Sequence, residues 1–376
     1  MPLDPLEFRT SLQRLLIGLI LILVPLTVIG FYTALQGDSY VHQANGDHFR
    51  TLTRTSAEMT SRFVGQFVKD VGLIANSPSI VQAVNSANRS YERLSEEAVR
   101  GKVDAIENKW NTSEGDVLSR SILASDLARE LRRDRELNGQ LLKITVADVN
   151  GATVAATEKP LHYFQTDREY WRLVYSQGQG AVHVSDVRYD EQNRLYYVNV
   201  AYPILQEGTG RFIGAVTTLV DLSPLFAQLN GQQIGRTGRL FLVREDGLVI
   251  QAPGVTPGMK IKSDELAAVR DALGTLRGRQ AGYIYTTLPR SGSYLIGFAD
   301  TGLREAYPNL PWFVVASQEE REAIGPVHGL AGFALFMMIL ALLMMTLLAA
   351  YVFLHRRQKL EDIETPSENN ERPAAA

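Results

Sequence analysis

The chain has 376 residues, a formal net charge of −3 and no cysteine. The lack of cysteine excludes disulfides, thiolate nucleophiles and cysteine-ligated metal centres. The near-neutral charge excludes a global basic field that would attract nucleic acid. Apolar residues make up 45% of the chain and charged residues 21%, which is typical of a folded protein rather than a disordered or fibrous one.

Two segments carry no charged residue, Leu15 to Leu35 and Leu330 to Leu354. A helix needs about 20 apolar residues to cross a bilayer, so both segments are predicted to be transmembrane helices. The alternative for the first segment is a cleaved signal peptide. Its apolar run is too long for that, and no small-x-small cleavage site follows it.

Basic residues flank the outer ends of these two segments. Arg9 and Arg14 precede the first, and a basic cluster that begins at Arg356 follows the second. Because Lys and Arg are enriched on the cytoplasmic side of a membrane, residues 1–14 and 355–376 are expected in the cytoplasm. The protein is thus expected in the inner membrane, with its main domain outside the cytoplasm and a short disordered tail.

Residues 36–140 are predicted to be mostly helical. A stripe of apolar side chains follows the first membrane segment at helical spacing and predicts a long amphipathic stalk helix. Further helices are predicted at Tyr91–Trp110 and Val117–Leu131. The apolar residues of the stalk stripe are Leu52, Met59, Phe63, Phe67, Val71 and Ile74.

Residues 141–230 change to a strand pattern, in which apolar side chains alternate with polar ones. Asn150-Gly151 is a hairpin signal between the first two strands. A short helix is predicted at Asp167–Ser176, and another follows Asp221 or Ser223, either of which can cap it. The predicted strands are Leu142–Val149, Ala152–Thr157, Ala181–Val187, Leu195–Leu205 and Phe212–Val220.

Residues 231–325 repeat the same order at an offset of roughly 95 to 100 residues, which predicts two tandem copies of one α/β unit. Gly151 and Gly247 are matching landmarks of the two hairpins. The helix of the second copy is predicted at Ser263–Leu276, with Ser263 as its cap. The predicted strands are Leu240–Val243, Leu248–Gln251, Gly282–Thr287, Ser293–Ala299 and Trp312–Ser317.

This arrangement resembles the double-Cache (dCache_1) family of extracytoplasmic sensor domains, as found in bacterial chemoreceptors and sensor kinases. The resemblance spans about residues 36–325. It implies an α+β fold with a stalk helix and two PAS-like units between two transmembrane helices, and a ligand pocket in the first, membrane-distal unit. The stretches that carry it are residues 73–81, 148–151, 214–223, 238–247 and 312–315.

The amino-acid-binding branch of this family uses a Tyr, an Arg five positions later, further aromatics, a Tyr-x-Asp and a final Asp. Here Arg188 stands where the Tyr of Tyr-x-Asp would be, and Leu219 stands at the position of the final Asp, while Asp221 fits a helix cap. The resemblance implies a ligand site made of Tyr163, Arg168, Tyr170, Trp171, Arg188 and Asp190.

An Arg fork suits a planar carboxylate, and aromatic walls enclose small ligands. With the final Asp replaced by Leu219, a carboxylate on the ligand is better supported than a free amine. Two structural alternatives remain open. The aromatic pair that follows Arg168 can be the core of a short helix, and Arg168 can pair with Asp167 or Glu169 on the surface.

No P-loop, nucleophile elbow or metalloprotease motif occurs, so no enzymatic activity and no cofactor are expected. His162 and His183 lack metal-ligand spacing. The first hypothesis is a sensor that forms a homodimer through its stalk and signals across the inner membrane. No output domain follows Arg357, so either a separate signalling protein reads the membrane helices or the chain is a truncated receptor. The second hypothesis is an envelope scaffold that uses the two units to dock other proteins.

Overall fold

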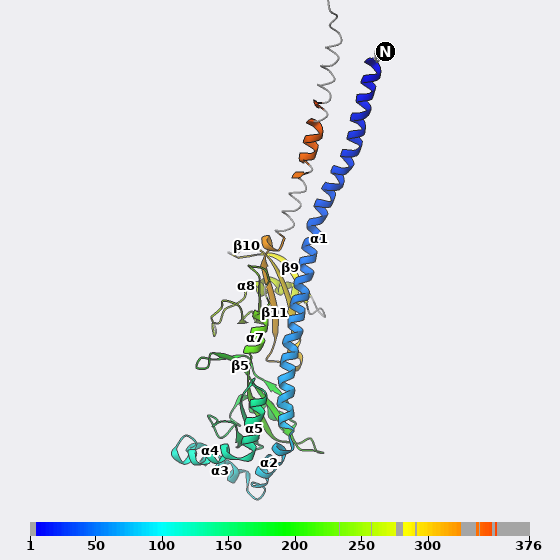
Figure 1. Ribbon diagram of the computed structural model, residues 1–376. Helices are drawn as coiled ribbons and strands as arrows, with labels where there is room; N and C mark the ends of the chain where they lie inside the picture. The colour runs from blue at the N-terminus through cyan, green and yellow to red at the C-terminus, as the bar shows by residue number, and fades with distance from the viewer. Residues whose placement is uncertain are drawn as a thin grey trace, which may run out of the picture. The chain divides into compact units, whose positions relative to one another are not determined.

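The structure is a computed structural model that describes residues 5–232, 234–256, 258–275, 281–289, 292–324, 336–337, 339–347 and 350–351. The chain divides into two compact units, one formed by Gly46–Glu320 and the other by the segments on either side of it. The larger unit is an α+β domain that contains two antiparallel sheets (Figure 1).

The N-terminal region is one helix, α1 (Pro5–Ala75), with Pro25 inside it. The Asn76-Ser77-Pro78 turn ends it, and the Ser77 hydroxyl accepts the Ile80 N–H to cap α2 (Pro78–Arg89). A Ser cap followed by Pro in the first turn is a strong helix-start signal.

The two helices predicted at Tyr91–Trp110 and Val117–Leu131 are three in the structure. Both serines that break the predicted pattern, Ser95 and Ser125, have extended backbones and accept an N–H from the following helix. The prediction followed helix-forming composition and missed these two caps. The helices are α3 (Glu96–Lys109), α4 (Ser113–Ala124) and α5 (Asp126–Leu137).

The first sheet has the strand order β2-β1-β6-β5-β3, with β4 also paired to β5. The strand predicted at Ala181–Val187 is shorter than expected, because only His183 and Val184 pair with β5 before the chain bends away. The strands are β1 (Leu141–Asp148), β2 (Thr153–Ala156), β3 (His183–Val184), β4 (Arg188–Asp190), β5 (Leu195–Leu205) and β6 (Phe212–Asp221).

The second sheet repeats this order as β8-β7-β11-β10-β9, which confirms the predicted tandem repeat. Gly151 and Gly247 take the same place in the two first hairpins, each with a positive φ, a conformation that glycine adopts without strain. The strands are β7 (Arg239–Arg244), β8 (Val249–Gln251), β9 (Ala281–Leu288), β10 (Gly292–Asp300) and β11 (Trp312–Glu319).

Four short helices accompany the sheets, and two of their predicted caps can be checked. The Ser263 hydroxyl accepts the Leu266 N–H and so caps its helix, as predicted. Asp221 accepts the Ser223 N–H at the start of the next helix. These helices are α6 (Glu169–Tyr175), α7 (Ser223–Asn230), α8 (Asp264–Thr275) and α9 (Leu303–Ala306).

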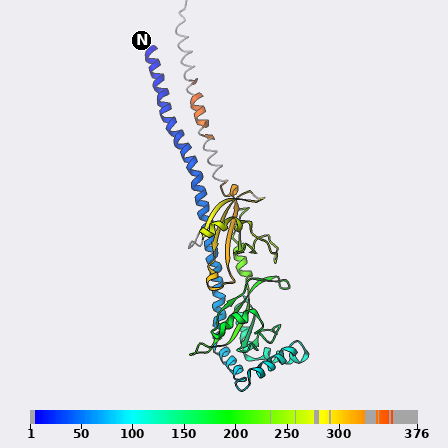
Figure 2. The same ribbon diagram turned by 180° about the vertical axis from the view of Figure 1, so that it is seen from behind.

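α1 runs alongside both sheets (Figures 1 and 2). A Cβ atom added to Gly297 of β10 would lie 2.8 Å from the Phe49 carbonyl oxygen, and one added to Gly72 would lie 2.8 Å from the Tyr202 ring on β5. The helix therefore approaches each sheet closely, and Gly297 is what permits the closer backbone contact.

The buried face of α1 differs from the predicted apolar stripe. Phe67 and Val71 are buried as expected, but Leu52, Met59 and Phe63 are only half-buried. Hydroxyl side chains take their place in the interior, because they satisfy their own hydrogen bonds: Thr53 and Thr60 donate to carbonyls four residues earlier. Such back-bonding lets a small polar residue pack inside a helix face. The buried residues of this part of α1 are Phe49, Thr53, Ser56, Ala57, Thr60, Val64, Phe67, Val68, Val71, Gly72 and Ala75.

Within the part of the chain that the structure describes, no helix is both long and apolar enough to cross a membrane. Most side chains of the first predicted span, Leu15 to Leu35, lie outside the described residues. The same holds for much of the second span, Leu330 to Leu354, and for the tail at 355–376. Both spans therefore stay predictions.

Asp148 ends β1 and organises the hairpin that follows. Its carboxylate accepts the N–H groups of Asn150 and Ala152 at 2.9 and 3.0 Å, and Tyr91 also hydrogen-bonds to it. Burial raises the pKa of Asp148 to about 6, even though these hydrogen bonds oppose the rise. Asp190 organises the β4–β5 turn in the same way from an exposed position, and its hydrogen bonds with Asn193 lower its pKa.

The contact between Gly297 and Phe49 predicts that Gly297→Ala destabilises the fold by about 1–3 kcal/mol, because the new methyl meets backbone that cannot rotate away. Gly65→Ala is the matched control, since a Cβ there meets open space and should be neutral or stabilising by up to about 1 kcal/mol. Urea unfolding of the full-length protein measures both changes. Equal effects of the two substitutions would show that α1 does not approach β10 this closely.

The raised pKa of Asp148 predicts a pH-dependent stability. Folded Asp148 keeps its proton until pH about 6, whereas an unfolded Asp releases it near pH about 4. Its contribution to stability is therefore complete below pH about 4 and is lost as the pH rises to about 6. Relative to Asp148→Asn, the wild type should lose about 2–3 kcal/mol of unfolding free energy over this range.

Asp190→Asn is the control for this pH experiment, because its carboxylate serves the same kind of turn with a pKa shifted the other way. The wild type should lose stability relative to this variant as the pH falls, not as it rises. Two parallel curves for Asp148→Asn and the wild type between pH about 4 and about 6 would contradict the prediction.

Candidate functional site

One face of the first sheet is built from small side chains. In the strand register, Thr145 lies opposite Thr217, which lies opposite Ala201. Alternate residues of a strand share a face, so this surface extends in both directions along the strands. We call it the α6 face, because α6 packs against it. Its members are Thr145, Ala147, Asn199, Ala201, Ala215, Thr217 and Leu219.

α6 covers one part of the α6 face with apolar side chains. Trp171 and Val174 are buried in a cluster with Ala147, Ala201 and Ala215, and the Trp171 ring meets Phe212 edge to face, with centroids 5.8 Å apart. Trp171, a predicted ligand contact, is thus a core residue of the α6 packing, which was its structural alternative.

The loop before α6 is held by side chains from α3. The Glu107 carboxylate accepts the N–H groups of Tyr163 and Phe164 at 2.8 and 2.9 Å and contacts His162 Nδ1 at 2.8 Å. The indole N–H of Trp110 donates to the Pro160 carbonyl at 2.8 Å. α3 and its cap residue Trp110 therefore fix the backbone of the loop around Tyr163, one of the predicted site residues.

Hydrogen bonds through Gln165 join Tyr170 to this loop. The Tyr170 hydroxyl donates to the Gln165 side chain at 2.5 Å, and the Gln165 amide donates to the His162 carbonyl. Tyr170 also hydrogen-bonds with Thr217 of the α6 face. Burial raises the pKa of Tyr163 and of Tyr170 to about 12, so each is a neutral hydroxyl at physiological pH.

Arg168 precedes α6 and is half-buried. Among the described residues, no carboxylate lies within ion-pair distance of it, so the alternative of a surface pairing with Asp167 or Glu169 is not formed. Its charge lies near enough to Tyr170 to oppose the rise of the Tyr170 pKa. The structure thus brings Arg168 and Tyr170 together at the edge of the α6 face.

Arg188 and Asp190 lie on β4, at the other end of the sheet. Arg188 is exposed and lines a cavity of about 190 Å³ together with Met259 and Lys260 of the second Cache unit. The Asp190 carboxylate is engaged by the β4–β5 turn. Within the described ranges, no hydrogen bond or ion pair joins either residue to the three site residues Tyr163, Arg168 and Tyr170.

Asn199 and Thr217 are polar members of the α6 face that the sequence reasoning missed. Asn199 pairs in register with Leu219, and its side-chain oxygen is buried without a hydrogen-bond partner in the described part of the chain. Strand alternation around the predicted Leu195–Leu205 strand was the available signal, since it puts Asn199 on the same face as Ala201.

His162 and His183 lie in other settings than a metal centre in the part of the chain that the structure describes. Across the described ranges, no three His, Asp or Glu side chains are placed to hold a metal ion. The Nδ1 atom of His162 hydrogen-bonds with the Glu107 carboxylate. His183 lies opposite Ala201, and burial lowers its pKa while the nearby Glu169 opposes that change.

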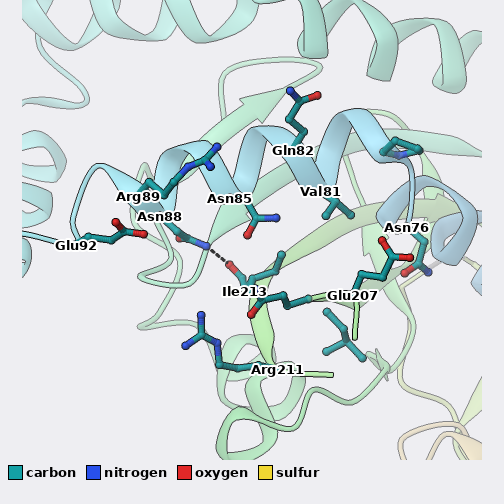
Figure 3. Close-up of a pocket in the computed structure, with 13 residues that line it drawn as sticks. Asn76, Val81, Gln82, Asn85, Asn88, Arg89, Glu92, Glu207, Arg211 and Ile213 are labelled. Atoms are coloured by element: carbon teal, nitrogen blue, oxygen red, sulfur yellow. Dashed lines mark hydrogen bonds between the residues drawn. The ribbon is translucent and has the colours of Figure 1, made fainter. Parts of the chain in front are cut away.

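A larger cavity, of about 960 Å³, lies on the other side of the first sheet, between α2 and the loop that joins β5 to β6 (Figure 3). Asn88 ties its two walls together, because its amide donates to the Ile213 carbonyl at 2.8 Å and accepts the Val149 N–H. None of the predicted site residues lines this cavity.

The solved structures that are similar to this chain share little sequence with it. The ligand-binding domain of a Pseudomonas aeruginosa amino acid chemoreceptor, in complex with L-arginine, is 14% identical over 74% of this chain and 96% of its own, with a TM-score of 0.43. That of a Pseudomonas fluorescens chemoreceptor, in complex with L-isoleucine, is 12% identical over 76% and 97%, with a TM-score of 0.44. No curated protein gives a significant match. The Cache domain family dCache_1 matches residues 38–327, which is most of the chain, and the protein therefore belongs to this family.

Proposed function

We propose that this protein is an extracytoplasmic sensor whose first Cache unit binds a small carboxylate-bearing molecule between the α6 face and the Tyr163–Trp171 segment. The observation that carries the proposal is the half-buried Arg168, which has no carboxylate partner among the described residues. An unpaired guanidinium in a partly desolvated place is costly unless an anion joins it. Family membership supports the same role, since Cache domains are sensor domains.

The polar groups of the α6 face favour an anionic ligand over one with a free amine. Leu219 provides no carboxylate where the family resemblance implies one. The nearest polar group in register is the neutral amide of Asn199, whose oxygen has no hydrogen-bond partner among the described residues. A buried ammonium needs a carboxylate partner, whereas a hydroxyl or amide of the ligand can satisfy Asn199. Amino acids therefore rank below hydroxylated or plain carboxylates.

A series of hydrogen bonds leads from the α6 face to the second Cache unit, which contains β7 to β11. It supports signalling by the pair of Cache units. Ser185 exchanges backbone and side-chain hydrogen bonds with Asn199 at 2.8 and 2.9 Å. Its neighbour Asp186 pairs with Arg244 of β7 at 2.6 Å. On the other side, the Val184 carbonyl accepts the Asn309 amide. A ligand that moves Asn199 would thus act on both sides of β3, provided that it binds one state better than the other.

We place the protein in the inner membrane with two spans, Leu15 to Leu35 and Leu330 to Leu354, both termini cytoplasmic and the Cache domain periplasmic. A separate signalling protein then reads the membrane helices. The apolar runs and the Lys and Arg bias of the sequence support this topology.

Thermal melting of the full-length protein against a panel of carboxylates, amino acids, amines and purines tests the ligand proposal. A ligand at about a hundredfold its dissociation constant adds about 2.7 kcal/mol, which raises the Tm by several degrees. Arg168→Ala should weaken a carboxylate hit by about tenfold to a hundredfold, because a charge-assisted hydrogen bond is lost.

Arg172→Ala is the matched control, since Arg172 is an exposed arginine of α6 and should leave the shift unchanged. A hit that Arg168→Ala does not weaken would overturn the proposed site. A panel without any hit would instead favour the second hypothesis, an envelope scaffold that uses the Cache units to dock other proteins.

We also propose a homodimer through α1, because Leu52, Met59 and Phe63 remain half-exposed on it. Met59→Lys should shift the protein towards monomer, since a two-fold axis would bring the new charges together. Gln66→Lys, at an exposed position of the same helix, should not. Sedimentation equilibrium of the full-length protein measures this, and a wild type that stays monomeric at all concentrations would refute the dimer.

A further inference from the structure

The cavity between α2 and the β5–β6 loop is a polar groove with charged ends (Figure 3). Arg89 of α2 and Arg211 of the loop lie towards one end, and Glu207 lies beside Asn76 towards the other. Neither arginine has an ion-pair partner within the part of the chain that the structure describes. Glu92 also lies at the arginine end, so the two guanidinium groups leave that end with an excess of one positive charge.

The middle of the groove offers a different chemistry. Val81 and Ile213 give it an apolar floor, and the Asn85 amide projects towards it (Figure 3). Asn85 has no hydrogen-bond partner among the described side chains and backbone groups. A primary amide carries both donors and an acceptor, which matches the N–H and C=O of a peptide unit.

We propose that this groove binds a short peptide with free ends, with the terminal carboxylate between Arg89 and Arg211 and the terminal ammonium at Glu207. Guanidinium groups recognise a carboxylate with charge-assisted hydrogen bonds, and Glu207 supplies the opposite charge for the amine. The apolar floor accepts small side chains, and Asn85 pairs with the peptide backbone.

The length of α2 sets the length of the peptide. The helix has 12 residues and is therefore about 18 Å long. An extended chain advances at most about 3.3–3.6 Å per residue, so about five residues span the groove. An oligosaccharide of this length fits less well, because none of the 13 lining residues has an aromatic ring on which a sugar can stack.

The second site is independent of the proposed ligand site at Arg168, which lies on the opposite face of the same sheet. Gly214 and Thr217 differ in strand parity, and Val84 of α2 packs on the Gly214 side. A substitution at one site should therefore leave the other intact, which allows the two proposals to fail separately.

Isothermal titration calorimetry of the full-length protein with pentaalanine tests the proposal. We expect binding that weakens at least about tenfold when the peptide is amidated at its carboxyl end, and equally when Arg211→Ala or Arg89→Ala removes the partner. In Glu207→Ala, acetylation of the peptide amine should no longer matter, whereas in the wild type it should weaken binding. Arg93→Ala, an exposed arginine outside the groove, and Arg168→Ala should both bind as the wild type does.

All five positions are exposed apart from the half-buried Arg168, so an unchanged Tm should show that each variant folds. If titration with pentaalanine releases or absorbs no heat of binding, the proposal is overturned. Equal binding of a peptide blocked at both ends overturns it as well, since the charged ends are its basis. Displacement of pentaalanine by maltopentaose would overturn the proposal and assign the groove to a glycan. If only the monomer binds pentaalanine and the dimer does not, the proposal is overturned and the groove is assigned to a second copy of the chain.

Discussion

The structure depends on the packing of one helix, α1, against both sheets. α1 lies against the first sheet near Tyr202 and against the second sheet near Gly297, where its backbone comes so close that only glycine fits. At these two close contacts a displacement of α1 is passed on to the sheet, because close-packed interfaces transmit displacement instead of absorbing it. The Asp186–Arg244 ion pair adds a second connection between the sheets.

Because α1 and α2 occupy one side of the first sheet, the α6 face has to be covered by other elements. α6 supplies apolar cover through Trp171, and the preceding loop is fastened by Glu107 and Trp110 of the α3 region. The helices inserted before β1 thus have a role that their sequence did not suggest. They fix the loop around Tyr163 that leads to Arg168 and α6, which reduces the ordering cost of binding.

The sequence predicted what depends on periodicity and missed what depends on tertiary partners. The repeat of Gly151 at Gly247, the strand Leu195–Leu205 and the Ser263 cap are local patterns, and each appears as predicted. Ser95 and Ser125 are helix caps that the sequence could have shown, but the prediction followed the helix-forming composition around them instead. Strand alternation could have placed Asn199 on the same face as Ala201, but only the structure shows that its side-chain oxygen has no partner among the described residues. Trp171 could not be assigned to the core without knowing that it meets Phe212.

The hydroxyl-lined stretch of α1 gives the helix an unusual freedom of translation. Thr53 and Thr60 direct their hydrogen bonds back into α1 itself, so these bonds travel with the helix. Of the buried hydroxyls on this stretch, Ser56 bonds across to another element, at Gln232. Within the stretch from Thr53 to Thr60, a small displacement of α1 along its own axis therefore breaks few polar contacts. The middle of the stalk helix can therefore shift more easily than its two close contacts, at Phe49 with Gly297 and at Gly72 with Tyr202.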